Sequence, residues 1–296
     1  MAIPETQLDT WSKLGSVTQS KATYASVRGV LERADAPYAS KNYAIFLQGS
    51  YGNDTNIYAD SDVDVVIRVD SVFYKDISEL TDPEKAAYES SFSNSAYSYN
   101  AFKADVSKHL TAHYGTAVKP GKKAIFIQAN GTRRDTDVLP AAQYRKYHRF
   151  SSSTDQSYTD GIVFWTTDGT EIVNYPKQHS TNCTTKHQAT NSWFKPTVRI
   201  LKNMRNAMID RGYIKDGLAP SYFLEGMLYN VPSAEFGKCY QDCVVNAINW
   251  LVKSDRSKLV CANEMYYLLH PTSPVTWRAE SLEAYLTAVA KFWKEW

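Results

Sequence analysis

The stretch that most constrains the fold of this chain is a Gly49-Ser50 pair followed by Asp62-Val63-Asp64. Side chains alternate along a strand, so Asp62 and Asp64 share one face and Val63 takes the other. Two carboxylates on one face repel each other unless cations lie between them, and Mg²⁺ prefers carboxylate and phosphate oxygens. Gly49 lets the backbone approach a phosphate closely, and Ser50 supplies N–H and O–H donors. The stretch therefore predicts a phosphate-binding loop that leads into a metal-binding strand.

A third aspartate, Asp137, precedes an apolar pair and Pro140 on a later predicted strand. With Asp62 and Asp64 it could hold two Mg²⁺ ions from adjacent strands. One ion would lower the pKa of an attacking hydroxyl, and the other would neutralise a triphosphate and its leaving pyrophosphate. The alternative is that Asp62 and Asp64 face solvent on an edge strand and that Asp137 is a turn residue. The order of Gly-Ser, Asp-x-Asp and a later Asp favours the metal site.

The composition is that of an ordinary globular protein. Of the 296 residues, 43% are hydrophobic and 22% are charged, enough for one large or two modest domains. The net charge of +2 is too small to indicate a nucleic-acid partner. Four cysteines without a CxxC pair fit a reducing cytoplasm. We expect no signal peptide, because residues 1–20 lack an apolar core, and no membrane span, because no run of about 18 apolar residues occurs.

The hydrophobic pattern predicts a sheet-based part before Pro176 and a helical part after it. Strands are expected over residues 43–48, 62–69, 124–127, 135–139, 161–165 and 171–175. The fourth of these is expected to close at Pro140. Helices in the second part are expected over residues 192–211, 220–230, 239–254, 262–269 and 280–294.

Helices are also expected in the first part. Apolar residues at mixed three- and four-residue steps indicate one over residues 5–35, with a point of interruption at Gly15-Ser16. Residues 70–123 are expected to form an excursion from the sheet. This excursion contains a capping box that starts at Thr81, and a helix marked by Phe102, Val106, Leu110 and Tyr114.

Two segments of the helical part could face a triphosphate. Lys195, Arg199 and Lys202 share one face of a predicted helix, but a solvated surface stripe explains this pattern equally well. Ser221 and Tyr222 follow a proline at the start of the next helix, where a helix N-terminus favours phosphate and a tyrosine could stack on a base. A tyrosine packed in the core is an equally good interpretation of Tyr222.

Pairs of His or Cys four residues apart also occur, and this spacing can hold zinc. The pairs are His109 with His113, Cys183 with His187, and Cys239 with Cys243. No complementary pair is evident for any of them, so a zinc site is not expected.

Several of these motifs resemble a known family. Gln48-Gly49-Ser50, Ser61-Asp62-Val63-Asp64 and Asp137-Val138-Leu139-Pro140 resemble motifs of the DNA-polymerase-β-like nucleotidyltransferases. Residues 175–179, 194–203 and 220–225 look like those of the bacterial CD-NTases. These enzymes are relatives of cyclic GMP–AMP synthase and oligoadenylate synthetase found in CBASS anti-phage systems.

The resemblance implies an α+β fold with a polymerase-β-like nucleotidyltransferase core and a C-terminal helical lobe. The core would span residues 1–175 and consist of a mixed sheet with helices, including a long N-terminal helix. The lobe would span residues 176–296. The active site would lie in the cleft between core and lobe. Two Mg²⁺ ions, which Mn²⁺ could replace, would be held by Asp62, Asp64 and Asp137. The nucleotide would be contacted by Gln48, Gly49, Ser50, Lys202, Ser221 and Tyr222.

The implied activity is synthesis of a cyclic oligonucleotide second messenger, a cyclic dinucleotide above all, from nucleoside triphosphates in anti-phage signalling. An acceptor ribose hydroxyl would attack the donor α-phosphorus and release pyrophosphate. A second attack of the same kind would close the ring. The implied enzyme is a cytoplasmic monomer without a membrane partner or a stable nucleic-acid partner, and a downstream effector would sense its product. Two alternatives stay open: transfer of AMP to a macromolecule or small molecule, and a catalytically inactive nucleotide sensor.

Overall fold

The computed structural model describes residues 2–58 and 62–296, so that Ser61, the first residue of the second motif, lies outside the described residues. The chain divides into two compact units. A helical unit comprises residues 1–17, 49–60 and 176–296, and a sheet unit comprises residues 18–48 and 61–175. The sequence assigns residues 1–17 and 49–60 to the core, whereas in the structure they group with the helices. None of the helices in the described part has the length and apolarity to cross a membrane.

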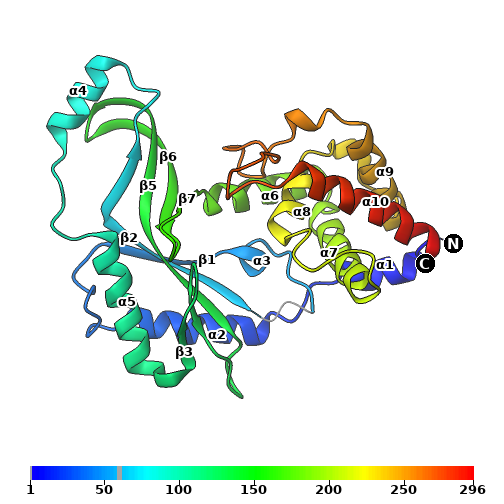
Figure 1. Cartoon of the computed structure of the whole chain (residues 1–296), viewed down its shortest axis with the longest axis horizontal. Coiled ribbons are helices and arrows are strands. Elements are labelled where there is room, and N and C mark those ends of the chain that lie inside the picture. The colour runs from blue at the N-terminus through cyan, green and yellow to red at the C-terminus, as the bar shows by residue number, and fades with distance from the viewer. Residues whose placement is uncertain (1, 59–61) are drawn as a thin grey trace. The chain divides into compact units, whose positions relative to one another are not determined.

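The sheet unit is built on a mixed seven-stranded sheet in the order β1-β2-β5-β4-β3, with β6 paired to β5 and β7 to β6 (Figure 1). Its strands are β1 (Tyr43–Leu47), β2 (Val63–Asp76), β3 (Val118–Pro120), β4 (Ile125–Ile127), β5 (Thr136–Ser152), β6 (Asp155–Trp165) and β7 (Glu171–Asn174). Among the described strands of this sheet, β2 and β5 pair in parallel and the other pairings are antiparallel. The six predicted strands are confirmed, and β3 is an additional one.

Strand β5 runs through Pro140, so the prediction that it closes there is wrong. Its antiparallel partners flank the proline, because β4 pairs with β5 as far as Val138 and β6 begins to pair at Ala142. Pro140 lies between these two partners. Its missing N–H therefore interrupts neither antiparallel ladder, which is how a strand tolerates proline.

Two helices cover β2, namely α2 (Thr18–Leu31) and α5 (Tyr99–Tyr114). The predicted apolar spacing of α5 is confirmed, since it buries Phe102, Val106 and Leu110. His109 also points inward, and its Nε2 lies 2.8 Å from the carbonyl oxygen of Val30 in α2. This histidine therefore joins the two helices and has no need of a metal ion.

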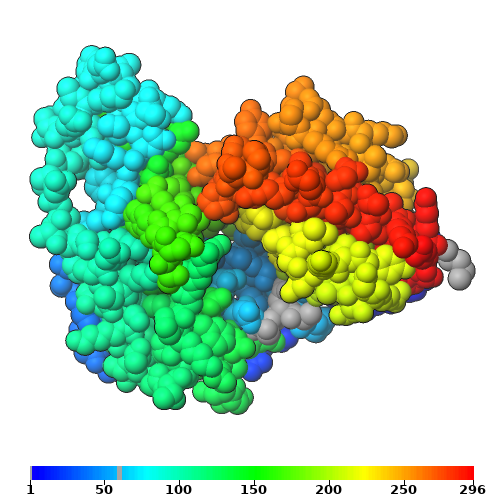
Figure 2. All heavy atoms as spheres, in the orientation of Figure 1, coloured from blue at the N-terminus to red at the C-terminus, as the bar shows by residue number. Residues whose placement is uncertain are grey.

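Helix α4 (Asp82–Ser91) packs at one end of β5, where its atoms form an exposed part of the sheet unit (cyan in Figures 1 and 2). Its predicted capping box is confirmed, because Glu84 accepts the Thr81 N–H at 2.9 Å. Tyr88 holds the helix to the strand, with its ring 5.1 Å from that of Tyr147 and 5.2 Å from that of Phe150. A short 3₁₀ helix, η1 (Gly115–Ala117), then leads into β3.

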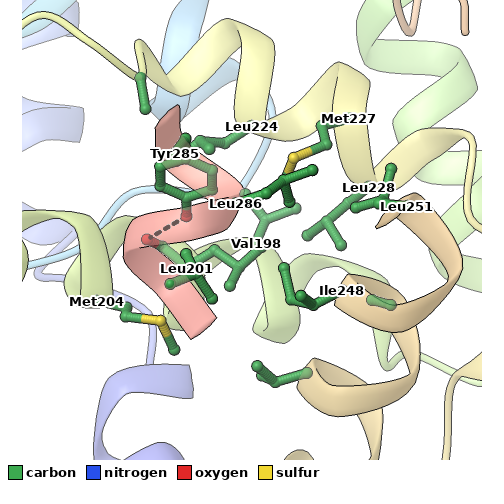
Figure 3. Packing of buried hydrophobic residues seen from close by; sticks show 14 of the residues in the cluster. Val198, Leu201, Met204, Leu224, Met227, Leu228, Ile248, Leu251, Tyr285 and Leu286 are labelled. Carbon is green, nitrogen blue, oxygen red and sulfur yellow. Dashed lines mark hydrogen bonds between the residues drawn. The ribbon is translucent and has the colours of Figure 1, made fainter. Parts of the chain in front are cut away.

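The helical unit contains α1 (Glu5–Ser12), α3 (Gly49–Gly52), α6 (Pro176–Ala189), α7 (Phe194–Asp210), α8 (Ser221–Tyr229), α9 (Tyr240–Lys253) and α10 (Ala279–Glu295), with short 3₁₀ helices η2 (Ser233–Glu235) and η3 (Arg256–Lys258). Helix α7 is central and contacts α1, α6, α8, α9 and α10. Figure 3 shows its Val198 and Leu201 surrounded by Leu224, Ile248 and Tyr285 of three other helices. Burial of this apolar surface stabilises the unit.

Two helix predictions in this unit need correction. The helix expected over residues 262–269 is absent from the structure, which has turns and isolated bridges there. Asn263 accepts the Met265 N–H with its own side chain at 3.0 Å, and this local bond competes with helical pairing. Conversely, α6 was not predicted, because it buries only His179 and Cys183 and so lacks an apolar stripe.

The N-terminal helix is interrupted at the predicted point, giving α1 and α2 in place of one long helix. The N–H of Gly15 donates to the carbonyl of Asn56 at 3.1 Å. A Cβ at this glycine would lie 2.4 Å from the carbonyl oxygen of Ile57, so the close approach requires glycine. The break is thus fixed by packing within the helical unit.

A buried arginine ties β2 to β6. Arg68 is 4% exposed, and its guanidinium donates to Asp70 at 2.6 Å, to Asp160 at 2.8 Å and to the Gly161 carbonyl at 3.2 Å. Two carboxylates thus neutralise this buried cation. Removing one partner of such a group leaves uncompensated charge.

We expect Arg68→Leu to lower the free energy of unfolding by about 3–5 kcal/mol, because Asp70 and Asp160 would lose their buried cation. Urea denaturation measures this. Arg149→Leu is the matched control, since its ion pair with Asp155 is exposed and screened by solvent, so its loss should change the free energy of unfolding far less. Equal losses in the two variants would contradict the prediction.

Candidate active site

Two of the predicted aspartates lie opposite each other on the parallel pair of strands β2 and β5. Asp64 of β2 and Asp137 of β5 are register partners, and such partners project from the same face of a parallel pair. Val63, Val65 and Val138 take the other face and are fully buried. The apolar neighbours therefore fix the direction in which both carboxylates point.

The third predicted aspartate, Asp62, comes immediately before β2 and is exposed. Burial, together with the negative charges of Asp62 and Asp135, raises the pKa of the half-buried Asp137 carboxyl above its ordinary value. Asp135 has a separate role, because its Oδ1 accepts the Ala129 N–H at 2.6 Å. The structure thus brings Asp62, Asp64 and Asp137 together as a group of like charges.

This donor set fits a divalent cation with a preference for oxygen. Its ligands are carboxylates alone, and a cation beside them would oppose both the burial and the repulsion that raise the pKa of Asp137. A second group, made of His179, Cys183 and Glu225, lies buried in the helical unit with its ligand atoms within 4.8 Å of one another. The Glu225 carboxylate already accepts hydrogen bonds from Thr55, Asn53 and His179 there.

Gln48 adjoins the aspartates. Its N–H donates to the carbonyl of Asp64 at 3.1 Å, which continues the β1–β2 ladder by one residue. Its side-chain Oε1 is buried, and no group in the described part of the chain bonds to it. Buried acceptors are almost always paired, so this oxygen accepts from a hydrogen-bond donor outside that part of the chain, such as a water molecule or a ligand.

Gly49 and Ser50 begin α3. Gly49 has φ of +64°, a left-handed conformation that glycine adopts at no steric cost. Ser50 is half-buried, and its carbonyl accepts the Thr55 N–H at 2.9 Å. The predicted phosphate loop is therefore a tight turn with a glycine where its geometry requires one.

The three remaining predicted nucleotide contacts have protein partners in the helical unit. Lys202 is fully buried, and its Nζ donates to the Thr55 carbonyl at 3.0 Å. Ser221 accepts from Arg205 at 3.1 Å. Tyr222 stacks on His179 with ring centroids 4.8 Å apart, and accepts a hydrogen bond from Asn263 at 3.0 Å. Their contacts with a nucleotide stay predictions.

The basic stripe of Lys195, Arg199 and Lys202 is buried, so the interpretation as a solvated surface stripe is wrong. Its partners include a residue that sequence reasoning missed, Glu225, which lies near Lys202. The signal for Glu225 was available. It is the one charged residue of the apolar helix α8, and an acid in such a helix requires buried partners.

Comparison with known proteins extends these observations. A sequence model described as the cGAS/DncV-like nucleotidyltransferase C-terminal helical domain matches residues 181–294. The cyclic UMP-AMP synthase of Rhodothermus marinus is 40% identical over 298 residues, which cover 100% of this chain and 99% of that protein. The chain belongs to the CD-NTase family. The cyclic nucleotide synthase CdnE01 of Staphylococcus haemolyticus is 36% identical, with 100% of both chains covered.

Solved structures agree with this membership. The R. marinus CdnE c-UMP-AMP synthase with Apcpp and Upnpp superposes on this CD-NTase with a TM-score of 0.89 at 39% identity, over 99% of this chain and 97% of that one. The Elizabethkingia meningoseptica CdnE cyclic dinucleotide synthase with GTP and Apcpp gives 0.77 at 29% identity, over 98% of both. The predicted α+β nucleotidyltransferase fold with a helical C-terminal part is therefore confirmed.

We expect Asp137→Asn to reduce nucleotide turnover by about 100-fold or more if, as the sequence predicts, its carboxylate is one of the metal ligands of the reaction. The same change relieves repulsion from Asp62 and Asp135, so the melting temperature should stay equal or rise. Pyrophosphate release and thermal melting measure the two effects.

Asp155→Asn is the control for this prediction, since Asp155 is an exposed aspartate at the start of β6. It should leave turnover unchanged. An Asp137→Asn enzyme with normal turnover would exclude Asp137 from the reaction.

Proposed function

We propose that this CD-NTase joins nucleoside triphosphates into a cyclic oligonucleotide second messenger, specifically a cyclic dinucleotide, for anti-phage signalling. The observation that carries the proposal is the pairing of Asp64 with Asp137 beside Asp62 on one sheet face. The names of relatives support the product class. Besides the two synthases above, a cyclic dipurine nucleotide synthase of E. meningoseptica is 33% identical over 93% of this chain and 94% of that protein.

In the proposed reaction, Asp62, Asp64 and Asp137 hold two Mg²⁺ ions, or Mn²⁺ in their place. When bound, such ions lower the pKa of an attacking ribose hydroxyl and neutralise charge on the triphosphate and the leaving pyrophosphate. The three carboxylates determine where the positive charge of the ions is held. The hydroxyl gives its proton to one of these carboxylates, its oxygen forms a bond to the donor α-phosphorus, and the bond from that phosphorus to pyrophosphate breaks, so that pyrophosphate leaves with the electron pair.

The donor phosphates are proposed to lie against Gln48, Gly49 and Ser50. The N–H and O–H groups of Ser50 supply hydrogen-bond donors for phosphate oxygens there, and the left-handed Gly49 permits close approach of the backbone. Orientation is the main contribution of these groups, because a fixed donor converts the attack into an effectively unimolecular step. A second attack of the same kind then closes the linear intermediate.

Transfer of AMP to another molecule would use the same carboxylates and is the second candidate. An enzyme that extends RNA would need a broad basic track, and the net charge of +2 gives little support for one. A catalytically inactive sensor would have no use for three carboxylates that repel one another. The identity of the product separates the candidates.

We expect the purified protein, incubated with the four nucleoside triphosphates and Mg²⁺, to yield a phosphatase-resistant product with the mass of a cyclic dinucleotide. Chromatography with mass spectrometry detects it, and single and paired triphosphates identify its bases. The Asp64→Asn variant is the control and should form none. A nucleotidylated protein or small molecule, formed without any cyclic product, would favour the second candidate.

Removal of divalent cations with EDTA should abolish the turnover, and excess Mg²⁺ or Mn²⁺ should restore it, because the site consists of carboxylates alone. The rate of pyrophosphate release measures both steps. Full turnover in EDTA would rule out metal binding by these aspartates as part of the reaction.

A further inference from the structure

Side chains of three helices bond to one short segment of the helical unit. It consists of residues 52–55, Gly52-Asn53-Asp54-Thr55, which directly follow Gly49, Ser50 and Tyr51. Side chains from three helices bond to it: Ser180 of α6, Lys195, Arg199 and Lys202 of α7, and Glu225 of α8. The centre of this network is out of contact with water, because Thr55, Lys202 and Glu225 are at most 2% exposed.

Glu225 is the centre of this arrangement. Its carboxylate accepts hydrogen bonds from the Thr55 hydroxyl, from Asn53 Nδ2 at 3.0 Å and from His179 Nε2 at 2.6 Å. Burial alone would raise the pKa of Glu225, but the bonds from His179 and Thr55 and the charge of Lys202 outweigh it and hold the pKa below its ordinary value. The group is therefore an ionised carboxylate, and His179 Nε2 must be the donor.

Cations and a hydroxyl hold the backbone of the same segment. Ser180 donates to the Gly52 carbonyl at 3.2 Å, Arg199 to the Asp54 carbonyl at 2.7 Å and Lys202 to the Thr55 carbonyl at 3.0 Å. Asp54 has φ of +54°, a left-handed conformation that costs a residue with a Cβ about 1 kcal/mol or more. The external bonds keep the segment in this conformation.

The anchored segment is bonded back to the predicted phosphate loop. The N–H of Asn53 donates to the Gly49 carbonyl at 3.1 Å, and the N–H of Thr55 donates to the Ser50 carbonyl at 2.9 Å. Whatever fixes Asn53 and Thr55 therefore also fixes Gly49 and Ser50. The buried network and the loop form one mechanically continuous unit.

We propose that Glu225 and Thr55 are positioning residues for nucleotide binding. They hold residues 52–55, and through them the Gly49-Ser50 turn, in the geometry that receives the donor phosphates. Glu225 touches no substrate in this proposal and acts through the Thr55 hydroxyl and the Asn53 amide. The proposal rests on the proposed function of Gly49 and Ser50.

Thr55→Val tests this, because it removes the hydroxyl that donates to Glu225 and keeps the side-chain shape. We expect the dissociation constant for α,β-methylene-ATP and the KM for nucleoside triphosphates to rise about tenfold, which is the value of a hydrogen bond to a charged group. Thr55→Ser restores the hydroxyl and should return both constants to within about twofold of the wild type. Calorimetry and initial rates provide the two readouts.

Thr197→Val is the matched control. Thr197 is as fully buried as Thr55 and belongs to the same unit, but its hydroxyl donates to the Trp193 carbonyl at 2.8 Å, within one turn of the chain. Its loss should lower the melting temperature, though by less than Thr55→Val does because the bond removed is to an uncharged group, and should leave nucleotide affinity unchanged. Equal effects of the two variants on affinity would mean that Thr55 has a structural role alone and would overturn the proposal.

Two further outcomes are decisive. If Thr55→Val does not fold, Ser180→Ala is used in its place, because this change removes a donor to the Gly52 carbonyl. Weaker nucleotide binding by Ser180→Ala would then support the proposal. Wild-type affinity would overturn the proposal. If the wild-type protein itself neither binds α,β-methylene-ATP nor forms a cyclic product, the proposed function fails, and the positioning role with it. An active wild type with an unaffected Thr55→Val variant overturns the positioning role alone.

Discussion

The parallel pairing of β2 with β5 is the constraint on which the chemistry of this protein depends. It sets Asp64 and Asp137 side by side, and a slip of one residue in either strand would turn one carboxylate to the opposite face. The register is held by the apolar face, where Val63, Val65 and Val138 are fully buried. Hydrophobic burial thus supplies the free energy that keeps like charges together against their repulsion.

In both compact units, a buried charged side chain is paired with opposite charge and hydrogen-bonded. In the sheet unit, Arg68 is surrounded by two carboxylates and a carbonyl. In the helical unit, Glu225 is matched by Lys202, His179 and two neutral donors. A buried ion is tolerable only when it is paired and hydrogen-bonded, so each of these groups fixes the segments that supply its partners. Buried charge serves here to specify geometry.

Much of the fold could be predicted from local pattern, because the signals for α5, α7 and the capping box at Thr81 lie within a few residues of each other. Local pattern gave the wrong result in three places, for different physical reasons. Pro140 is tolerated inside β5 because the antiparallel partner strands β4 and β6 pair with β5 on either side of the proline and not at it. Helix α6 forms although its sequence is polar and has no apolar stripe. Residues 262–269 have helical spacing but form turns, because the Asn263 side chain accepts the Met265 N–H.

The sequence by itself determined the chemistry of the candidate site: three aspartates with a Gly-Ser turn, and the strand period that puts Asp62 and Asp64 on one face. These properties depend on residues one or two positions apart, and alternation along a strand is a local rule. Only the tertiary structure decided that Asp137 faces Asp64 and that Lys195, Arg199 and Lys202 are buried around one loop. Register and burial depend on residues more than seventy positions apart in the sequence, which no local period specifies.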